Sequence, residues 1–177
     1  CTFTHAKQGR ILVDEVTTPS GDPQAFSFAL TGGPDAISQA FSLTDAAAPH
    51  DSGFVRSGTF VIAQGAIPAD WDFTGASCSD GSPVSAVAVG AGEIVTCTFR
   101  HTKRGKITVV KDARPNDPQD FAFSLSGPGG TQSFPLDDDA DPTLPNSRSF
   151  TVLPGSYVVT EGDPGAMWDN TGISCTS

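Results

Sequence analysis

Residues 9–32, GRILVDEVTTPSGDPQAFSFALTG, return later in the chain as residues 105–127, GKITVVKDARPNDPQDFAFSLSG. A second pair of segments repeats in the same order. Residues 57–79, SGTFVIAQGAIPADWDFTGASCS, match residues 154–176, PGSYVVTEGDPGAMWDNTGISCT. Self-similarity at a fixed spacing is the signature of a duplicated structural unit. The chain is therefore expected to hold two copies of one module.

Each copy has the pattern of a β-sandwich. FSFAL and FAFSL alternate apolar with small side chains, so Phe26, Phe28 and Leu30 are expected on one strand face. Clusters of Pro and Gly mark turns, and no 11-residue window keeps a helical period without a breaker. Short strands with frequent turns predict an all-β fold of two tandem, seven-stranded-type antiparallel sandwiches. In the first copy the strands are expected at residues 10–16, 25–31, 39–44, 54–63, 72–78, 84–89 and 93–101.

The last strand of the first copy also stands at the start of the chain. CTFTHAKQG opens the sequence, and the same stretch returns as CTFRHTKRG from Cys97. The second copy stops after its GISC strand, without a counterpart of this closing strand. We therefore expect residues 1–8 to be a closing strand that belongs to a neighbouring domain. Residues 9–103 are expected to form a complete sandwich, and residues 104–177 a sandwich completed by a strand from the next subunit or repeat.

Composition excludes several classes of protein. The 177 residues include 20 acidic and 10 basic side chains, for a formal net charge of -10. A negative field argues against nucleic acid as a partner, because phosphate binding needs a basic face. No run of about 18 apolar residues occurs, so no membrane span is expected. The 4 cysteines lack CxxC spacing, which favours disulfides in an oxidising, extracellular, secreted or cell-surface setting over a zinc site.

The four cysteines form two pairs when the copies are aligned. Cys78 and Cys97 lie 19 residues apart at the ends of two strands of the first copy, so we expect a disulfide there; the alternative is two buried thiols. Cys175 is the counterpart of Cys78, and Cys1 that of Cys97, yet neither has a partner in its own domain. We expect Cys1 of one molecule to bridge Cys175 of the next.

Such a contact joins two different surface patches of identical molecules. Repeated contacts of this kind build an open filament, unless the rotation between successive molecules closes them into a ring. Strand addition would supply main-chain hydrogen bonds to an open sheet edge and would hide that edge. The alternative, left open here, is a fragment of a longer tandem array in which the same strand joins successive modules. The expected donor strand comprises Cys1, Thr2, Phe3, Thr4, His5, Ala6 and Lys7.

Three stretches resemble a known family. GKITVVKDARPNDPQDFAFSLSG, LDDDADPT and FTVLPGSYVVTEGDPGAMWDNTGISC resemble the prealbumin-like, Cna B-type (Ig-like) repeat domains of bacterial surface and secreted proteins. The resemblance covers nearly the whole chain and is most specific in residues 105–175. It implies a seven-stranded sandwich that serves as a stalk, spacer or pilus-like building block.

Many domains of this kind carry an isopeptide bond between a first-strand Lys and a last-strand Asn or Asp, assisted by a buried acid. Lys111 matches the Lys position and Glu161 matches the acid. The closing strand, however, has His101 or His5 where the acceptor is expected, and His has no carboxamide carbon to attack. This departure argues against an isopeptide bond in the second copy.

The first copy departs further, because Glu15 replaces the Lys and Gln64 replaces the acid. No isopeptide bond is expected there, and the cysteine bridge would hold the last strand instead. Cys97, Phe99 and His101 alternate on that strand and share a face. His101 is expected to point inward, near Glu15 or Gln64, as a core side chain and not a catalytic one.

The acidic run LDDDADPT is the sharpest candidate for bound metal, and calcium is the one cofactor it suggests. Calcium takes six to eight oxygen ligands, which carboxylates and carbonyls supply. The spacing is not that of an EF-hand, and the alternative is a solvated acidic loop. The candidate ligands are Asp137, Asp138, Asp139 and Asp141, with Asn116, Asp117 and Asp120 from a neighbouring loop.

Signals for catalysis are absent from the sequence. It contains no G-x-S-x-G elbow, no HExxH and no Gly-rich phosphate loop after a strand. We therefore predict a structural protein and not an enzyme: a subunit of an extracellular fibre, stalk or sheath whose main partner is itself. The alternative is an adhesin or carbohydrate-binding segment of a larger surface protein, with Trp71 and Trp168 stacking on a glycan or another cell-surface ligand. Their matching positions favour a packing role for both.

Overall fold

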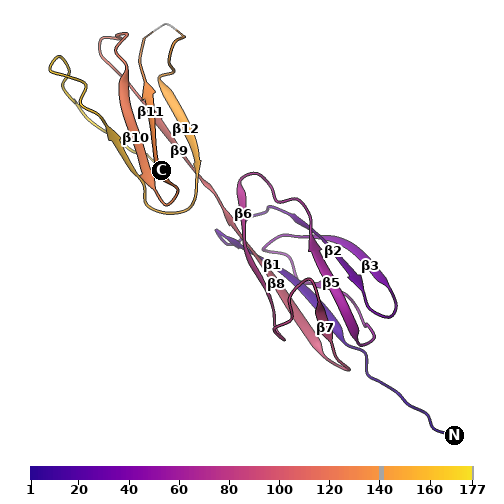
Figure 1. Ribbon diagram of the computed structural model, residues 1–177. Helices are drawn as coiled ribbons and strands as arrows, with labels where there is room; N and C mark the ends of the chain where they lie inside the picture. Colours follow the sequence, from indigo (N-terminus) through magenta and orange to yellow (C-terminus); the bar gives the residue numbers. More distant parts are fainter. Residues whose placement is uncertain (140–141, 177) are drawn as a thin grey trace. The chain divides into compact units, whose positions relative to one another are not determined.

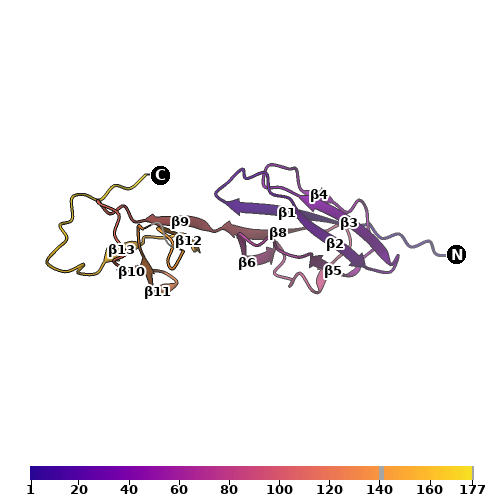
Figure 2. The ribbon, with the colours of Figure 1, turned by 90° about the horizontal axis from the view of Figure 1, so that it is seen from above.

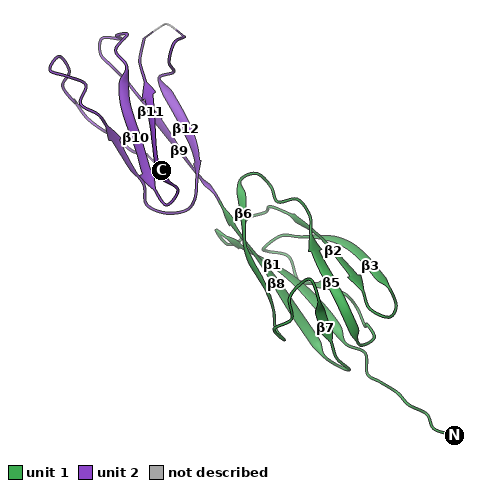
Figure 3. Ribbon diagram, viewed as in Figure 1, with its two compact units in different colours: residues 1–103 green, residues 104–177 purple. Residues whose placement is uncertain are grey.

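A computed structural model describes residues 1–139 and 142–176, which fall into two units (Figures 1 and 3). Unit 1 comprises Cys1–Lys103 and unit 2 comprises Arg104–Ser177. Every regular element in the described ranges is a strand. The predicted all-β fold of two tandem domains is confirmed.

Unit 1 is a sandwich of two four-stranded sheets. One sheet has the order β4-β1-β8-β6, and the other has the order β3-β2-β5-β7. Figure 2 shows β8 between β1 and β6. The strands are β1 (Arg10–Thr18), β2 (Phe26–Gly32), β3 (Ile37–Leu43), β4 (His50–Asp51), β5 (Gly58–Gln64), β6 (Trp71–Cys78), β7 (Val87–Val89) and β8 (Ile94–Lys103).

Unit 2 repeats this plan with fewer strands. Its described sheets have the orders β12-β9 and β11-β10-β13. By the repeat alignment, β9 is the counterpart of β1, β10 of β2 and β13 of β5. The strands are β9 (Gly105–Val110), β10 (Phe121–Gly127), β11 (Gly130–Leu136), β12 (Ser147–Val152) and β13 (Val158–Glu161).

The alternating strands build one apolar core in each unit. Phe26, Phe28 and Leu30 are buried on one face of β2, as the period-two pattern predicts. Phe121, Phe123 and Leu125 are buried in the same way on β10. Trp71 meets Phe26 edge-to-face, and Trp168 meets Phe121 in the same geometry, with ring centroids 5.3 and 5.2 Å apart. Both Trp side chains thus contact their own core, which favours the packing interpretation.

Three expectations need correction. β4 was not predicted, because a two-residue strand leaves no alternating pattern. β5 begins at Gly58 and not at residue 54, since Val55 instead forms a bridge with Gly9. The pairing is not wholly antiparallel: β1 and β8 run parallel.

The prediction of a strand at GISC is also wrong, since residues 163–176 form no strand in the structure. Their counterpart in unit 1 is β6, which pairs only with β8. A strand needs a partner for its backbone groups. Unit 2 has no counterpart of β8 among its described strands, so this segment has no ladder to join.

Candidate functional site

The closing strand β8 lies inside one sheet of unit 1. It pairs with β1 from Arg10↔Ile94 to Thr18↔Thr102, and with β6 on its other side. Its inward side chains supply a continuous row of the core. This row consists of Val95, Cys97, Phe99 and His101, each no more than 2% exposed.

In the described part of unit 2, two strand edges lack the partners that their counterparts have. β1 pairs with β8, whereas β9 pairs only with β12. β5 pairs with β7, whereas β13 pairs only with β10. Apolar side chains are exposed beside both edges, with Val110 62% exposed on β9 and Val158 62% exposed on β13. Unpaired edges with exposed apolar side chains are templates for added strands.

Lys111 and Glu161 come together beside the open edge of β9. Lys111 Nζ lies 2.7 Å from Glu161 Oε1 and 3.8 Å from the centroid of the Phe121 ring. Both side chains are largely buried. This is an ion pair with no covalent bond. A pocket of about 270 Å³ opens next to it, lined by Lys111, Glu161, Gly162, Asp163, Pro164, Trp168, Asp169 and Asn170.

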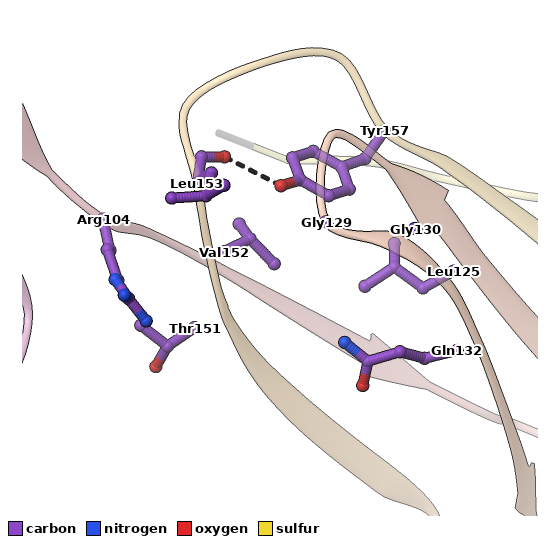
Figure 4. Close-up of a pocket in the computed structure, with 9 residues that line it drawn as sticks. All are labelled: Arg104, Leu125, Gly129, Gly130, Gln132, Thr151, Val152, Leu153 and Tyr157. Atoms are coloured by element: carbon purple, nitrogen blue, oxygen red, sulfur yellow. Dashed lines mark hydrogen bonds between the residues drawn. The ribbon is translucent and has the colours of Figure 1, made fainter. Parts of the chain in front are cut away.

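A second hollow of about 230 Å³ lies near the end of β12 (Figure 4). Tyr157 forms one wall, and its hydroxyl donates to the carbonyl of Leu153 over 2.9 Å. In unit 1 the counterpart of Tyr157 is Phe60, which pairs with Val87 of β7. Unit 2 has no strand corresponding to β7 within its described range, so Tyr157 has no strand partner of the kind that Phe60 has.

The expected donor segment is an exposed, extended stretch outside the sheets. Residues 1–8 form no strand, and the Phe3 side chain is 87% exposed. One backbone contact holds its end, where the amide of Gly92 donates to the carbonyl of Lys7 over 3.0 Å. The apolar Phe3 corresponds to Phe99, which is buried in the core of unit 1.

The cysteines divide into one bridged pair and two thiols. Cys78 and Cys97 face each other across β6 and β8 and form a disulfide with an S–S distance of 2.02 Å. Cys1 and Cys175 are free and exposed. The bridge between Cys1 and Cys175 of different molecules therefore remains a prediction.

His101 points into the core of unit 1, between the two residues that the sequence suggested. Its Nδ1 lies 2.7 Å from Glu15 Oε1, and its Nε2 lies 2.5 Å from Gln64 Nε2. An amide nitrogen can only donate, so the ring proton is on Nδ1 and is donated to Glu15. The His101 ring also stacks on Phe26, with centroids 4.1 Å apart. The histidine is thus a packed, hydrogen-bonded core residue.

Burial changes the protonation of this group. Desolvation, reinforced by the negative charges of Asp45 and Asp14, raises the pKa of Glu15 to about 8. Desolvation also lowers the pKa of His101 below its usual 6.5. Glu15 Oε2 has no hydrogen-bond partner. At neutral pH both side chains are therefore uncharged, which suits a site without solvent.

The acidic loop of unit 2 makes internal hydrogen bonds. Asp137 is buried and accepts from the amide of Asp139 over 3.3 Å, and Asp138 accepts from the amide of Ala113 over 2.8 Å. In the nearby loop Asp117 accepts from the amide of Gln119, whereas the side chains of Asn116 and Asp120 make no hydrogen bond to another described residue. Asp141 lies outside the described residues. Within the described ranges no three acidic, His or Cys side chains are grouped to hold a metal.

The calcium interpretation stays a prediction that a titration can test. If the loop binds calcium, added calcium chloride will raise the melting temperature of the protein by mass action, and a chelator will reverse the shift. Magnesium at the same ionic strength is the control. A melting temperature that does not change with calcium would contradict the interpretation.

One polar contact of the closing strand was not predicted from the sequence. Lys103 Nζ donates to Asp22 Oδ2 over 2.8 Å and lies 5.6 Å from the Trp71 ring centroid. Asp22 also accepts from the amide of Gln24. A signal was present, because the triplet DPQ occurs in both copies and both closing-strand segments carry Lys at this position.

This fold is that of a prealbumin-like sandwich, and the family comparison agrees. The model of the prealbumin-like fold domain family matches residues 11–103, more than half of the chain, so the chain belongs to that family. Among the curated proteins, none matches it.

Several solved structures are similar in fold. The Bacillus anthracis TIE protein is 15% identical, with a TM-score of 0.46 over 88% of this chain, which spans only 28% of that protein's length. A C-terminal fragment of the pilus adhesin SpaC from Lactobacillus rhamnosus GG is 17% identical, with a TM-score of 0.39 and coverage of 88% and 75%. A streptococcal ancillary pilin is 14% identical, with a TM-score of 0.37 and coverage of 98% and 58%.

A search of the described residues for helices long and apolar enough to span a membrane finds none.

Proposed function

We propose that this protein is a structural subunit of an extracellular fibre, stalk or sheath on a cell surface. Residues 1–7 of one copy pair with the open edge of β9 in unit 2 of the next copy, and repetition of that contact produces a head-to-tail homopolymer. One observation supports this most strongly. Unit 2 lacks a counterpart of β8 among its described strands, while residues 1–7 match residues 97–103 of β8 at five of seven positions and lie outside any sheet.

The connection between domains supports the same arrangement. β8 leads into β9 through Arg104 alone, within the stretch CTFRHTKRG. CTFTHAKQG leads into β1 in the same way. A donated N-terminal strand would therefore repeat between molecules the sequence that joins the two units within one molecule.

A disulfide between Cys1 of one copy and Cys175 of the next would lock each joint. Non-reducing gel electrophoresis of oxidised protein should then give a ladder of covalent oligomers that collapses to one band with reductant. The variant Cys1→Ser should run as a monomer under both conditions. A single monomer band from the unmodified protein would contradict the covalent fibre. This holds whether Cys1 and Cys175 are free thiols or are bridged to each other within one molecule.

A further inference from the structure

The pocket beside the Lys111–Glu161 pair has a filled counterpart in unit 1. Lys111 corresponds to Glu15 and Glu161 to Gln64. In unit 1 the imidazole of His101 lies between these two side chains, within 2.7 Å of the first and 2.5 Å of the second. The pocket of about 270 Å³ in unit 2 therefore opens beside the counterparts of the two side chains that hold a closing-strand histidine in unit 1.

The polar lining of this pocket suits a neutral imidazole that carries its proton on Nε2, whereas His101 carries its proton on Nδ1. In unit 1 Gln64 donates to Nε2, and Nδ1 donates to Glu15. In unit 2 the ammonium of Lys111, the counterpart of the residue at Nδ1, can only donate, and the carboxylate of Glu161, the counterpart of the residue at Nε2, accepts. The two groups contact each other directly, so an entering imidazole would separate this ion pair and replace it with two hydrogen bonds. Both nitrogens of an entering imidazole would thus have a partner of the right kind.

A lysine position lies next to the histidine position. In unit 1 the ammonium of Lys103 contacts Asp22 and the face of Trp71. By the repeat alignment, the counterparts of Asp22 and Trp71 in unit 2 are Asp117 and Trp168. Asp117 accepts from the amide of Gln119 over 3.0 Å, just as Asp22 accepts from Gln24 over 2.9 Å. In unit 1 the histidine and the lysine that make these contacts, His101 and Lys103, lie two residues apart on β8.

Resting on the proposed function, we propose that this pocket is the receptor for His5 of a second copy, with Lys7 of the same segment bound to Asp117. His5 corresponds to His101 and Lys7 to Lys103. The segment brings positive charge to an acidic protein of formal net charge -10. The two side chains set the register of the donated strand, because a slip by one residue would turn both away from the pocket.

A charge exchange tests the lysine contact in protein with Cys1→Ser and Cys175→Ser, so that association is non-covalent. We expect Lys7→Glu and Asp117→Lys each to weaken self-association about tenfold in sedimentation experiments, and the double variant to restore it to near the parent level. Restoration by the second reversal excludes a simple loss of folding.

The histidine contact has a matched control on the same strand. His5→Ala should weaken association about tenfold, since two hydrogen bonds are lost. Thr4→Ala should have no effect, because its counterpart Arg100 is exposed on β8. If the parent protein associates but none of these changes alters its affinity, the inference is wrong and the proposed function stands. A parent protein that remains monomeric at every concentration would overturn both.

Discussion

Removing both bridged cysteines, Cys78→Ala with Cys97→Ala, is expected to lower the free energy of unfolding of unit 1 by about 3 kcal/mol. The bridge closes a loop of sequence separation 19, which restricts the unfolded chain. It also joins β6 to the closing strand at the directly paired positions Cys78↔Cys97. Denaturant unfolding followed by tryptophan fluorescence, with Cys1 and Cys175 replaced by Ser throughout, measures the difference.

Unit 2 provides an internal reference for this experiment. Its tryptophan, Trp168, reports on a domain without an internal bridge, so its transition should keep its midpoint while that of Trp71 moves. Each transition can be assigned by a Trp→Phe variant of the other unit. A difference below about 1 kcal/mol in unit 1 would contradict a role of the bridge in holding β8.

The strands of unit 1 were largely predictable because their side chains obey local rules. Alternation of Phe and small residues places β2 and β10 and identifies their buried faces. The parallel pairing of β1 with β8 was not predictable, since register between strands so far apart in sequence depends on the whole sandwich. The lack of a strand in residues 163–176 was not predictable for a similar reason, because pairing depends on distant parts of the chain. This segment has strand-like residues but no described neighbour to pair with.

The candidate site was predictable where the two copies differ at matched positions. Aligning Glu15 with Lys111 identified a pair of positions that the structure places around one pocket or one histidine. The contact of Lys103 with Asp22 was missed, since it joins residues 81 apart through a loop that no periodicity describes. The available signal was that DPQ occurs in both copies and that both closing-strand segments end in Lys, at Lys103 and Lys7.

The stability of unit 1 is expected to fall by about 2 kcal/mol between pH 6.5 and pH 8 through Glu15. Its pKa of about 8 in the folded protein exceeds the usual 4.5, so above pH 4.5 the folded state holds one proton more than the unfolded state. His101 opposes this below pH 6.5, because its lowered pKa leaves it neutral when folded but protonated when unfolded. The two effects oppose each other below pH 6.5, and the loss due to Glu15 dominates above it.

The charged groups near Glu15 do not add a further change of stability between pH 6.5 and pH 8. Asp45 accepts from the amides of Thr17 and Gly21, which lowers its pKa, so its contribution changes only in acid. Asp14, which also raises the pKa of Glu15, lies on the same strand.

Glu15→Gln removes the titrating group while keeping an oxygen that can accept from His101. The variant should keep constant stability between pH 6.5 and 8, and should therefore gain about 2 kcal/mol on the unmodified protein over that interval. Urea unfolding at the two pH values measures this. Asp35→Asn is the matched control, because Arg56 lowers the pKa of Asp35 and removes it from the window, so its slope should equal that of the unmodified protein. Equal slopes for the Gln variant and the unmodified protein would mean that Glu15 is already ionised in the folded core. The buried Glu15–His101 contact would then be an ion pair.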